Sequence, residues 1–199
     1  MRKNKAMMAE KEMEKKTDEE LVSLSLKDPA FFRILVGRYE KRLFFYVLRL
    51  SRLSREDAED LLQDIFLSVY RNLNDFDRDL KFSSWIYRIA HNRTVSFWRK
   101  NKNRERVLSQ DEEMKLINLP SSENLSRELE IRGDAEEVQK TLKKISKKSR
   151  EVLLLRFFED KSYEEISDIL EKPMGTVATL LSRAKKEMLE TMDKNSIKV

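Results

Sequence analysis

The stretch "SYEEISDILEKPMGTVATLLSRAKKEM", residues 162–188, decides the fold of the second half of this chain. Ser162 followed three residues later by Glu165 is the pattern of a capping box, in which each side chain accepts a free backbone amide at a helix start. Apolar residues then recur at helical spacing. The pattern predicts a short helix over 163–170.

Pro173 and Gly175 interrupt this pattern in a chain that holds only three prolines and three glycines. Pro173 suits the first turn of a following helix, because its missing N–H is not needed there. That second helix is expected to reach about residue 192. Two helices joined by a tight turn predict a helix-turn-helix whose second helix lies in a DNA major groove. The alternative is a plain helical hairpin in a bundle, which needs no DNA.

The composition predicts an all-α protein without a metal or a cofactor. Glycine and proline are scarce, whereas Leu, Glu, Lys and Arg are abundant. The chain has no cysteine and one histidine, His91, so neither a thiolate nor a His-rich metal site is expected. There is no run of 18 apolar residues and no secretory signal, and the absence of cysteine suits a reducing cytoplasm.

The apolar pattern divides the chain into two parts. It is dense over 18–100, it is lost in the polar segment 101–133, and it returns over 134–192. Residues 1–17 are rich in Met, Lys and Glu and are expected to be disordered or frayed, and 193–199 form a tail. We therefore predict two small helical domains joined by a flexible linker, the second being the helix-turn-helix domain.

A row of carboxylates marks the predicted helix "REDAEDLLQDIFLSVYRNL", residues 55–73. Its apolar positions form one face, while Asp57, Asp60, Asp64 and Leu67 lie on the other. Ordinary acidic charge near a helix N-terminus explains part of this row. A row of carboxylates with one leucine in it is also typical of a docking face for a basic helix. A metal site is not expected, because no histidine or third acid is placed nearby.

Aromatic and basic residues alternate in "NDFDRDLKFSSWIYRIAHNRTVSFWRKNKNR", residues 74–104. Some of these rings belong to a core. Rings among cations are also what single-stranded DNA needs, because bases stack on the rings while cations follow the backbone. We expect the loop before Trp85 to form a small polar pocket for an extruded base.

Three segments together resemble bacterial RNA polymerase sigma factors of the extracytoplasmic-function (ECF) group in the sigma-70 family. "DAEDLLQDIFLSVYRNL" is similar to the helix of their region 2 that docks on the polymerase clamp. "FSSWIYRIAHNRTVSFWRK" is similar to their promoter-melting helix. "REVLLLRFFEDKSYEEISDILEKPMGTVATLLSRAKKEM" is similar to region 4, which recognises the −35 element. The resemblance covers about 20–100 and 135–190, in the same order.

The resemblance implies a function for each group of residues. For core-polymerase docking they are Asp57, Asp60, Leu61, Gln63, Asp64 and Leu67. For −10 DNA binding and melting they are Phe76, Lys81, Phe82, Ser83, Trp85, Arg88, Asn92, Arg93, Trp98 and Arg99. For −35 DNA binding they are Arg150, Arg156, Ser162, Thr176, Thr179, Ser182, Arg183, Lys185 and Lys186.

The implied partners are core RNA polymerase and promoter DNA. Contacts are expected with the clamp of the largest subunit and the flap of the second largest. An anti-sigma factor, often membrane-tethered in this family, is a further expected partner, and no small-molecule substrate is expected. Two alternatives stay open: a helix-turn-helix activator that does not dock on the polymerase, and a metal-dependent nuclease that uses the clustered carboxylates.

The recognition helix departs from the family pattern at two positions. Family members commonly have "GTVKSRLxRAR", whereas this chain has "GTVATLLSRAK". Ala178 and Leu180 therefore stand where cations are usual. This departure bears on the strength of −35 recognition and not on the fold.

Overall fold

The computed structural model describes residues 15–51, 53–78, 80–100 and 135–196, and among these it contains helices and turns but no strand. The predicted all-α class is confirmed for this part of the chain. The predicted linker and most of the predicted disordered start lie outside the described residues.

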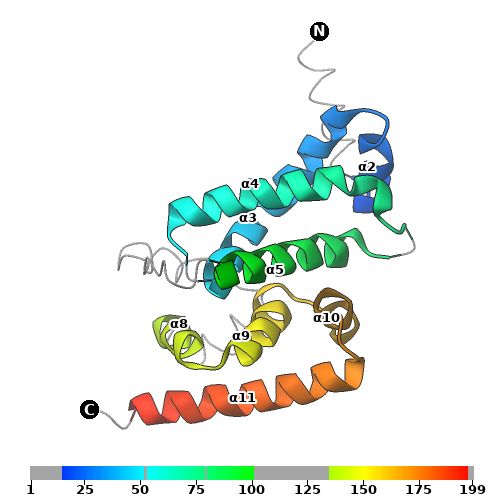
Figure 1. Ribbon diagram of the computed structural model, residues 1–199. Coiled ribbons are helices and arrows are strands. Elements are labelled where there is room, and N and C mark those ends of the chain that lie inside the picture. The colour runs from blue at the N-terminus through cyan, green and yellow to red at the C-terminus, as the bar shows by residue number, and fades with distance from the viewer. Residues whose placement is uncertain (1–14, 52, 79, 101–134, 197–199) are drawn as a thin grey trace.

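The described part of the first half contains four helices, drawn in blue to green in Figure 1. They are α2 (Asp18–Ser25), α3 (Phe32–Ser51), α4 (Arg55–Arg71) and α5 (Phe82–Lys100), with short 3-10 turns η1 (Pro29–Phe31) and η2 (Leu73–Asp75). Local sequence fixes where these helices begin. Thr17 and Glu20 form a capping box at α2, and the Ser54 hydroxyl accepts the amide of Asp57 at 3.2 Å at the start of α4.

The second half, drawn in yellow to red in Figure 1, is a separate group of helices. It contains α8 (Ala135–Lys144), α9 (Lys147–Leu153), α10 (Tyr163–Leu170) and α11 (Met174–Ser196). A wide π turn, η3 (Leu154–Phe158), continues α9. Helix α11 runs four residues past the predicted end at residue 192.

The helix-turn-helix begins as the sequence predicts. The Ser162 hydroxyl accepts the Glu165 amide at 3.1 Å, and the Glu165 carboxylate accepts the Ser162 amide at 2.9 Å. Both halves of the capping box are therefore present at the start of α10. The predicted helix over 163–170 is confirmed residue for residue.

The turn between α10 and α11 is made differently from the prediction. Glu171 adopts the left-handed conformation, with φ of 52°, and so ends α10. Pro173 precedes α11 and accepts the first amides of that helix through its carbonyl, so it does not lie within the first turn. Gly175 lies inside the first turn without a left-handed φ. The turn therefore depends on Glu171 and not on Gly175.

The two halves pack against each other along α5. Its apolar side faces α3 and α4, and its other side is covered by α10, while η3 packs on α3. Figure 1 shows α5 between the upper and lower groups of helices. Helix α5 is thus covered on two sides, which limits how much of it is exposed.

An aromatic cluster at the start of α5 corrects one prediction. Phe76, Phe82 and Trp85 are between 0% and 7% exposed, and their ring centroids lie 5.3–5.7 Å apart. The predicted exposed stacking surface and base pocket in this loop are therefore not formed by these rings. The three rings pack into the core and do not form an exposed stacking surface, because burying large rings stabilises the fold more than leaving them in water.

Replacement of Trp85 by alanine is expected to destabilise the protein by about 3–5 kcal/mol, the usual cost of emptying a large aromatic site in a core. Urea unfolding followed by circular dichroism measures this free energy. Trp98→Ala serves as the matched control, because Trp98 is only partly buried and should cost clearly less. Equal and small losses for both variants would show that Trp85 is not a core residue.

Candidate polymerase and nucleic-acid interfaces

The outer face of α4 presents an exposed stripe of acidic and apolar side chains. We call Asp60, Gln63, Asp64 and Leu67 the α4 stripe, since all four are exposed and Leu67 is 52% exposed. None of the four is needed to hold the core, which is built from the opposite face of the helix. Their side chains are therefore available to a partner.

Two of the residues predicted for docking do not belong to this stripe. Leu61 is only 3% exposed and packs in the core, so its predicted surface role is wrong. Its spacing places it on the same face as Ala58 and Ile65. Asp57 is half-buried, and its carboxylate accepts the Ser54 hydroxyl at 2.9 Å. Asp57 thus serves mainly to cap the helix.

A groove of about 1150 Å³ borders the α4 stripe. It lies between α3 and α4, and the stripe residues Gln63 and Leu67 form part of its wall. Its lining is mostly apolar, including Phe44 and Phe66, with charged side chains such as Glu59 among them. A groove beside an acidic row suits a helix that carries both apolar and basic side chains.

The remaining −10 candidates lie along the exposed parts of α5 and the residue before it. Lys81, Asn92, Arg93 and Arg99 are exposed, whereas Ser83, Arg88 and Trp98 are half-buried. Asn92 and Arg93 line a small polar cleft of about 260 Å³ between α4 and α5. Arg93 donates to the Ser68 hydroxyl there at 2.9 Å. The cleft is lined from α4 and from the part of α5 that follows Trp85.

The exposed face of α11 carries hydroxyl and basic groups close together. They are Thr176, Thr179, Ser182, Arg183, Lys185 and Lys186, all exposed. Thr179 donates to the carbonyl of Gly175 at 2.9 Å, and Lys186 lies 3.8 Å from Glu190. Hydroxyls and cations on one side of a second helix are the donors that phosphates and base edges accept.

Three residues predicted to bind −35 DNA also have structural tasks within the second half. Arg150 donates to the carbonyls of Leu142, Lys143 and Ile145 and so caps the end of α8. Arg156 donates to the carbonyl of Lys161 at 3.0 Å and holds the loop before α10. Ser162 is the cap of α10. The sequence predicts the capping role of Ser162. It does not predict the roles of Arg150 and Arg156, because the carbonyls that they reach become neighbours only in the folded chain.

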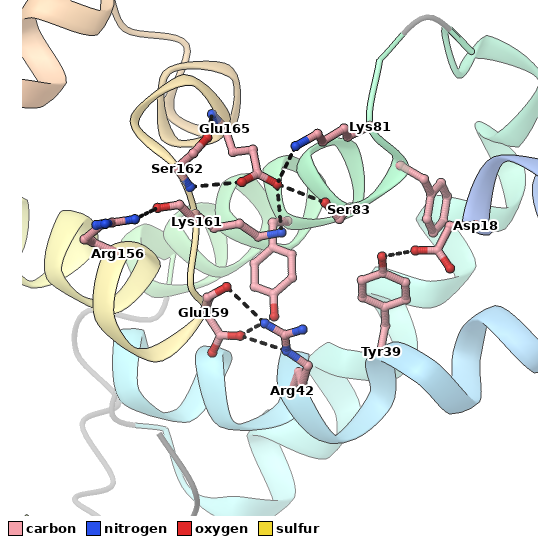
Figure 2. Close-up of polar contacts among 12 residues, drawn as sticks. Asp18, Tyr39, Arg42, Lys81, Ser83, Arg156, Glu159, Lys161, Ser162 and Glu165 are labelled. Carbon is pink, nitrogen blue, oxygen red and sulfur yellow. Dashed lines mark hydrogen bonds and ion pairs between the residues drawn. The ribbon is translucent and has the colours of Figure 1, made fainter. Parts of the chain in front are cut away.

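Three residues at the contact between the halves are not predicted from the sequence. Arg42 on α3, Tyr87 on α5 and Glu159 after η3 meet there, as Figure 2 shows for the labelled Arg42 and Glu159. No local pattern marks them, because Arg42 and Glu159 are 117 positions apart. Only the packing of the two halves brings them together.

His91 lies in the buried side of α5, where its Nδ1 is 2.9 Å from the Tyr46 hydroxyl. Burial, with the positive charges of Lys147 and Lys172, lowers the pKa of His91 to about 4. His91 is therefore neutral at pH 7. The cations that lower its pKa belong to the second half of the chain.

Among the described residues, no group of three or more His, Cys, Asp and Glu side chains could hold a metal ion. Within the same part of the chain, no helix is both long and apolar enough to cross a bilayer.

Comparison with known proteins assigns both halves to one family. Residues 35–104 match the Sigma-70 region 2 model, and residues 135–188 match the Sigma-70, region 4 model. The chain is 31% identical to the ECF RNA polymerase sigma-E factor of Haemophilus influenzae, over 89% of this chain and 95% of that protein. The chain therefore belongs to the sigma-70 family of RNA polymerase sigma factors, in its ECF group.

Two solved structures share the fold. CnrH in complex with the cytosolic domain of CnrY superposes with a TM-score of 0.67 at 23% identity, covering 90% of this chain and 99% of that one. The sigma factor RpoE in complex with the anti-sigma factor NepR, from Bartonella quintana, gives 0.61 at 21% identity, covering 81% and 96%. Both likenesses confirm the two-part helical architecture.

The stability of the protein should fall on mild acidification because of His91. The histidine takes up a proton at about pH 6.5 when unfolded but only at about pH 4 when folded. Its contribution is present above pH 6.5 and is lost as the pH falls to 4. The loss amounts to roughly 3 kcal/mol in the free energy of unfolding.

Urea unfolding of the wild type and of His91→Gln at several pH values measures the contribution of His91 to the free energy of unfolding. Between pH 6.5 and 4, the wild type should lose more of this free energy than His91→Gln does. Parallel pH profiles would mean that His91 is not buried as a neutral ring.

Proposed function

We propose that this sigma factor docks on core RNA polymerase through the α4 stripe and directs initiation at promoters that it recognises through α5 and α11. The exposure of the stripe carries the proposal. Asp60 and Asp64 support no structure within the described residues, yet they lie in a row with the exposed Leu67 beside an apolar groove. Such a surface complements a basic, amphipathic helix on the polymerase clamp.

Promoter contacts are divided between two helices. The exposed donors of α5 are proposed to hold the melted −10 strand, with Asn92 and Arg93 at the cleft that borders α4. The exposed hydroxyls and cations of α11 are proposed to contact duplex DNA at the −35 element. Arg183 is the central cation of that face, since Ala178 and Leu180 replace the cations usual in the family.

We propose that the chain itself catalyses no reaction, and that it acts in the cytoplasm with the polymerase. The synthesis of RNA then belongs to the polymerase, and this chain supplies binding and promoter choice. An anti-sigma protein is proposed as a second partner. Of the two solved structures with the same fold, the one of RpoE with the anti-sigma factor NepR supports that proposal. The groove beside the α4 stripe is its candidate site.

Charge reversal in the α4 stripe tests the docking surface. Asp64→Arg should weaken binding to purified core RNA polymerase by about tenfold or more, because an arginine would meet a basic partner surface. Fluorescence anisotropy of the labelled chain measures the dissociation constant.

Asp168→Arg is the matched control, since Asp168 is exposed on α10, outside the stripe. It should leave the affinity unchanged. If Asp64→Arg keeps both normal helicity and normal affinity for the polymerase, the docking assignment is wrong.

Restoring a missing cation tests the orientation of α11. Ala178→Lys should tighten binding to promoter duplex, and each phosphate it neutralises should steepen the slope of log affinity against log salt by about 0.9. A lysine directed at a base would instead change the preferred upstream sequence. Binding of the full chain to duplex DNA across a salt series distinguishes these results.

Leu189→Lys adds the same charge near the far end of α11 and serves as the control, because Leu189 is 48% exposed there. It should change the slope little. If Ala178→Lys alters neither slope nor preference, and Arg183→Ala loses no affinity, α11 does not face DNA.

A further inference from the structure

The segment from Phe158 to Glu165 lies against the first half of the chain, and a buried carboxylate is at its centre. Glu159 is 3% exposed and accepts a hydrogen bond from the Tyr87 hydroxyl. Arg42 approaches the same carboxylate at 3.4 Å through Nε, and it donates to the Glu159 carbonyl at 3.0 Å. Figure 2 shows Arg42 reaching from α3 towards Glu159. One residue of region 4 is thus bound by two helices of region 2.

A second contact places Glu165 on residues assigned above to promoter DNA. Its carboxylate lies 3.8 Å from Lys81 Nζ and accepts the Ser83 hydroxyl at 3.4 Å (Figure 2). Lys161, 3.6 Å from Glu165, also lies 4.7 Å above the ring of Tyr87. A lysine ammonium and a serine hydroxyl are the donors that hold a phosphate. A DNA phosphate bound here would meet the same two donors that Glu165 now meets.

The same contact contains a feature that opposes it. Arg49 stacks on Phe158 at 4.6 Å, yet its buried Nε has no hydrogen-bond partner among the described residues. A buried donor left without a partner costs about 1–3 kcal/mol. Separation of the halves would remove Phe158 from Arg49 and release this cost, so the contact is suited to opening.

We propose that the free chain holds itself closed, with Glu159 bound to α3 and α5 and with Glu165 paired with Lys81 and Ser83 in place of a DNA phosphate. Promoter DNA must then displace region 4 from α5 before the −10 strand can contact Lys81 and Ser83. The covering of a DNA site rests on the function proposed above, whereas the closed form itself rests only on the contacts between the halves.

Pulsed electron paramagnetic resonance can measure the closed form directly. The natural chain has no cysteine. Spin labels can therefore be placed on Glu56→Cys in α4 and Glu190→Cys in α11, both exposed and away from the contact. The doubly labelled full chain is compared with and without Glu159→Lys, which would place a cation among Arg42, Arg49 and Lys161. Glu164→Lys makes the same charge change at an exposed position of α10 and is the matched control.

The wild type and Glu164→Lys should give one narrow distance, and Glu159→Lys should give a longer and broader one. Tyr87→Phe, which keeps the packing and removes only the donor to Glu159, should lengthen part of the population even if Glu159→Lys folds poorly. A wild-type distribution that is already as long and broad as that of Glu159→Lys would overturn the closed form.

Binding of a fluorescent single-stranded DNA oligonucleotide to the same proteins tests the covering of the DNA site. If the closed form is favoured about tenfold, Glu159→Lys should bind about tenfold tighter than Glu164→Lys. Equal affinities together with a lengthened distance would uphold closure but overturn the covering of the site. That result would count against the assignment of Lys81 and Ser83 to DNA.

Discussion

The relation between the two halves depends on a carboxylate removed from water. An ionised Glu159 is stable at 3% exposure only where donors and cations surround it. Burial raises the pKa of Glu159, while the Tyr87 hydroxyl and the guanidinium groups of Arg42 and Arg49 act in the opposite direction. Because these partners lie on α3 and α5, Glu159 sets where region 4 meets region 2. Helix α5 is consequently covered on two sides. One face packs in the core against α3 and α4, and another face contacts α10 of region 4.

Local patterns predict much of this fold because they act within a few residues. The capping box of Ser162 and Glu165 and the apolar face of α4 follow from spacing alone. Contacts between distant segments do not, and the burial of Phe82 and the capping role of Arg150 both depend on what packs beside them. An aromatic or basic residue suits a core, a cap or a DNA surface equally well until its neighbours are known. For that reason the helix-turn-helix was predictable, whereas several of its proposed DNA contacts were not.

Several side chains in this protein serve two tasks, and this links its stability to its function. Glu165 completes the cap of α10 and also contacts Lys81 across the domain boundary. Burial acts to raise the pKa of Glu165, but the Ser162 amide, Lys161 and Lys81 together hold it below its usual value. It therefore remains a charged group that competes with phosphate for the same lysine. In α4, likewise, one face builds the core while the other presents the acidic stripe to a partner.

This chain gives core RNA polymerase its choice of promoter. The most direct test is transcription of genomic DNA by purified core polymerase, with and without the chain, followed by sequencing of transcript 5′ ends. We expect new start sites that share two upstream elements at a fixed separation and that appear only when the chain is present. An unchanged set of start sites, from a chain that still binds duplex DNA, would indicate a helix-turn-helix regulator instead of a sigma factor.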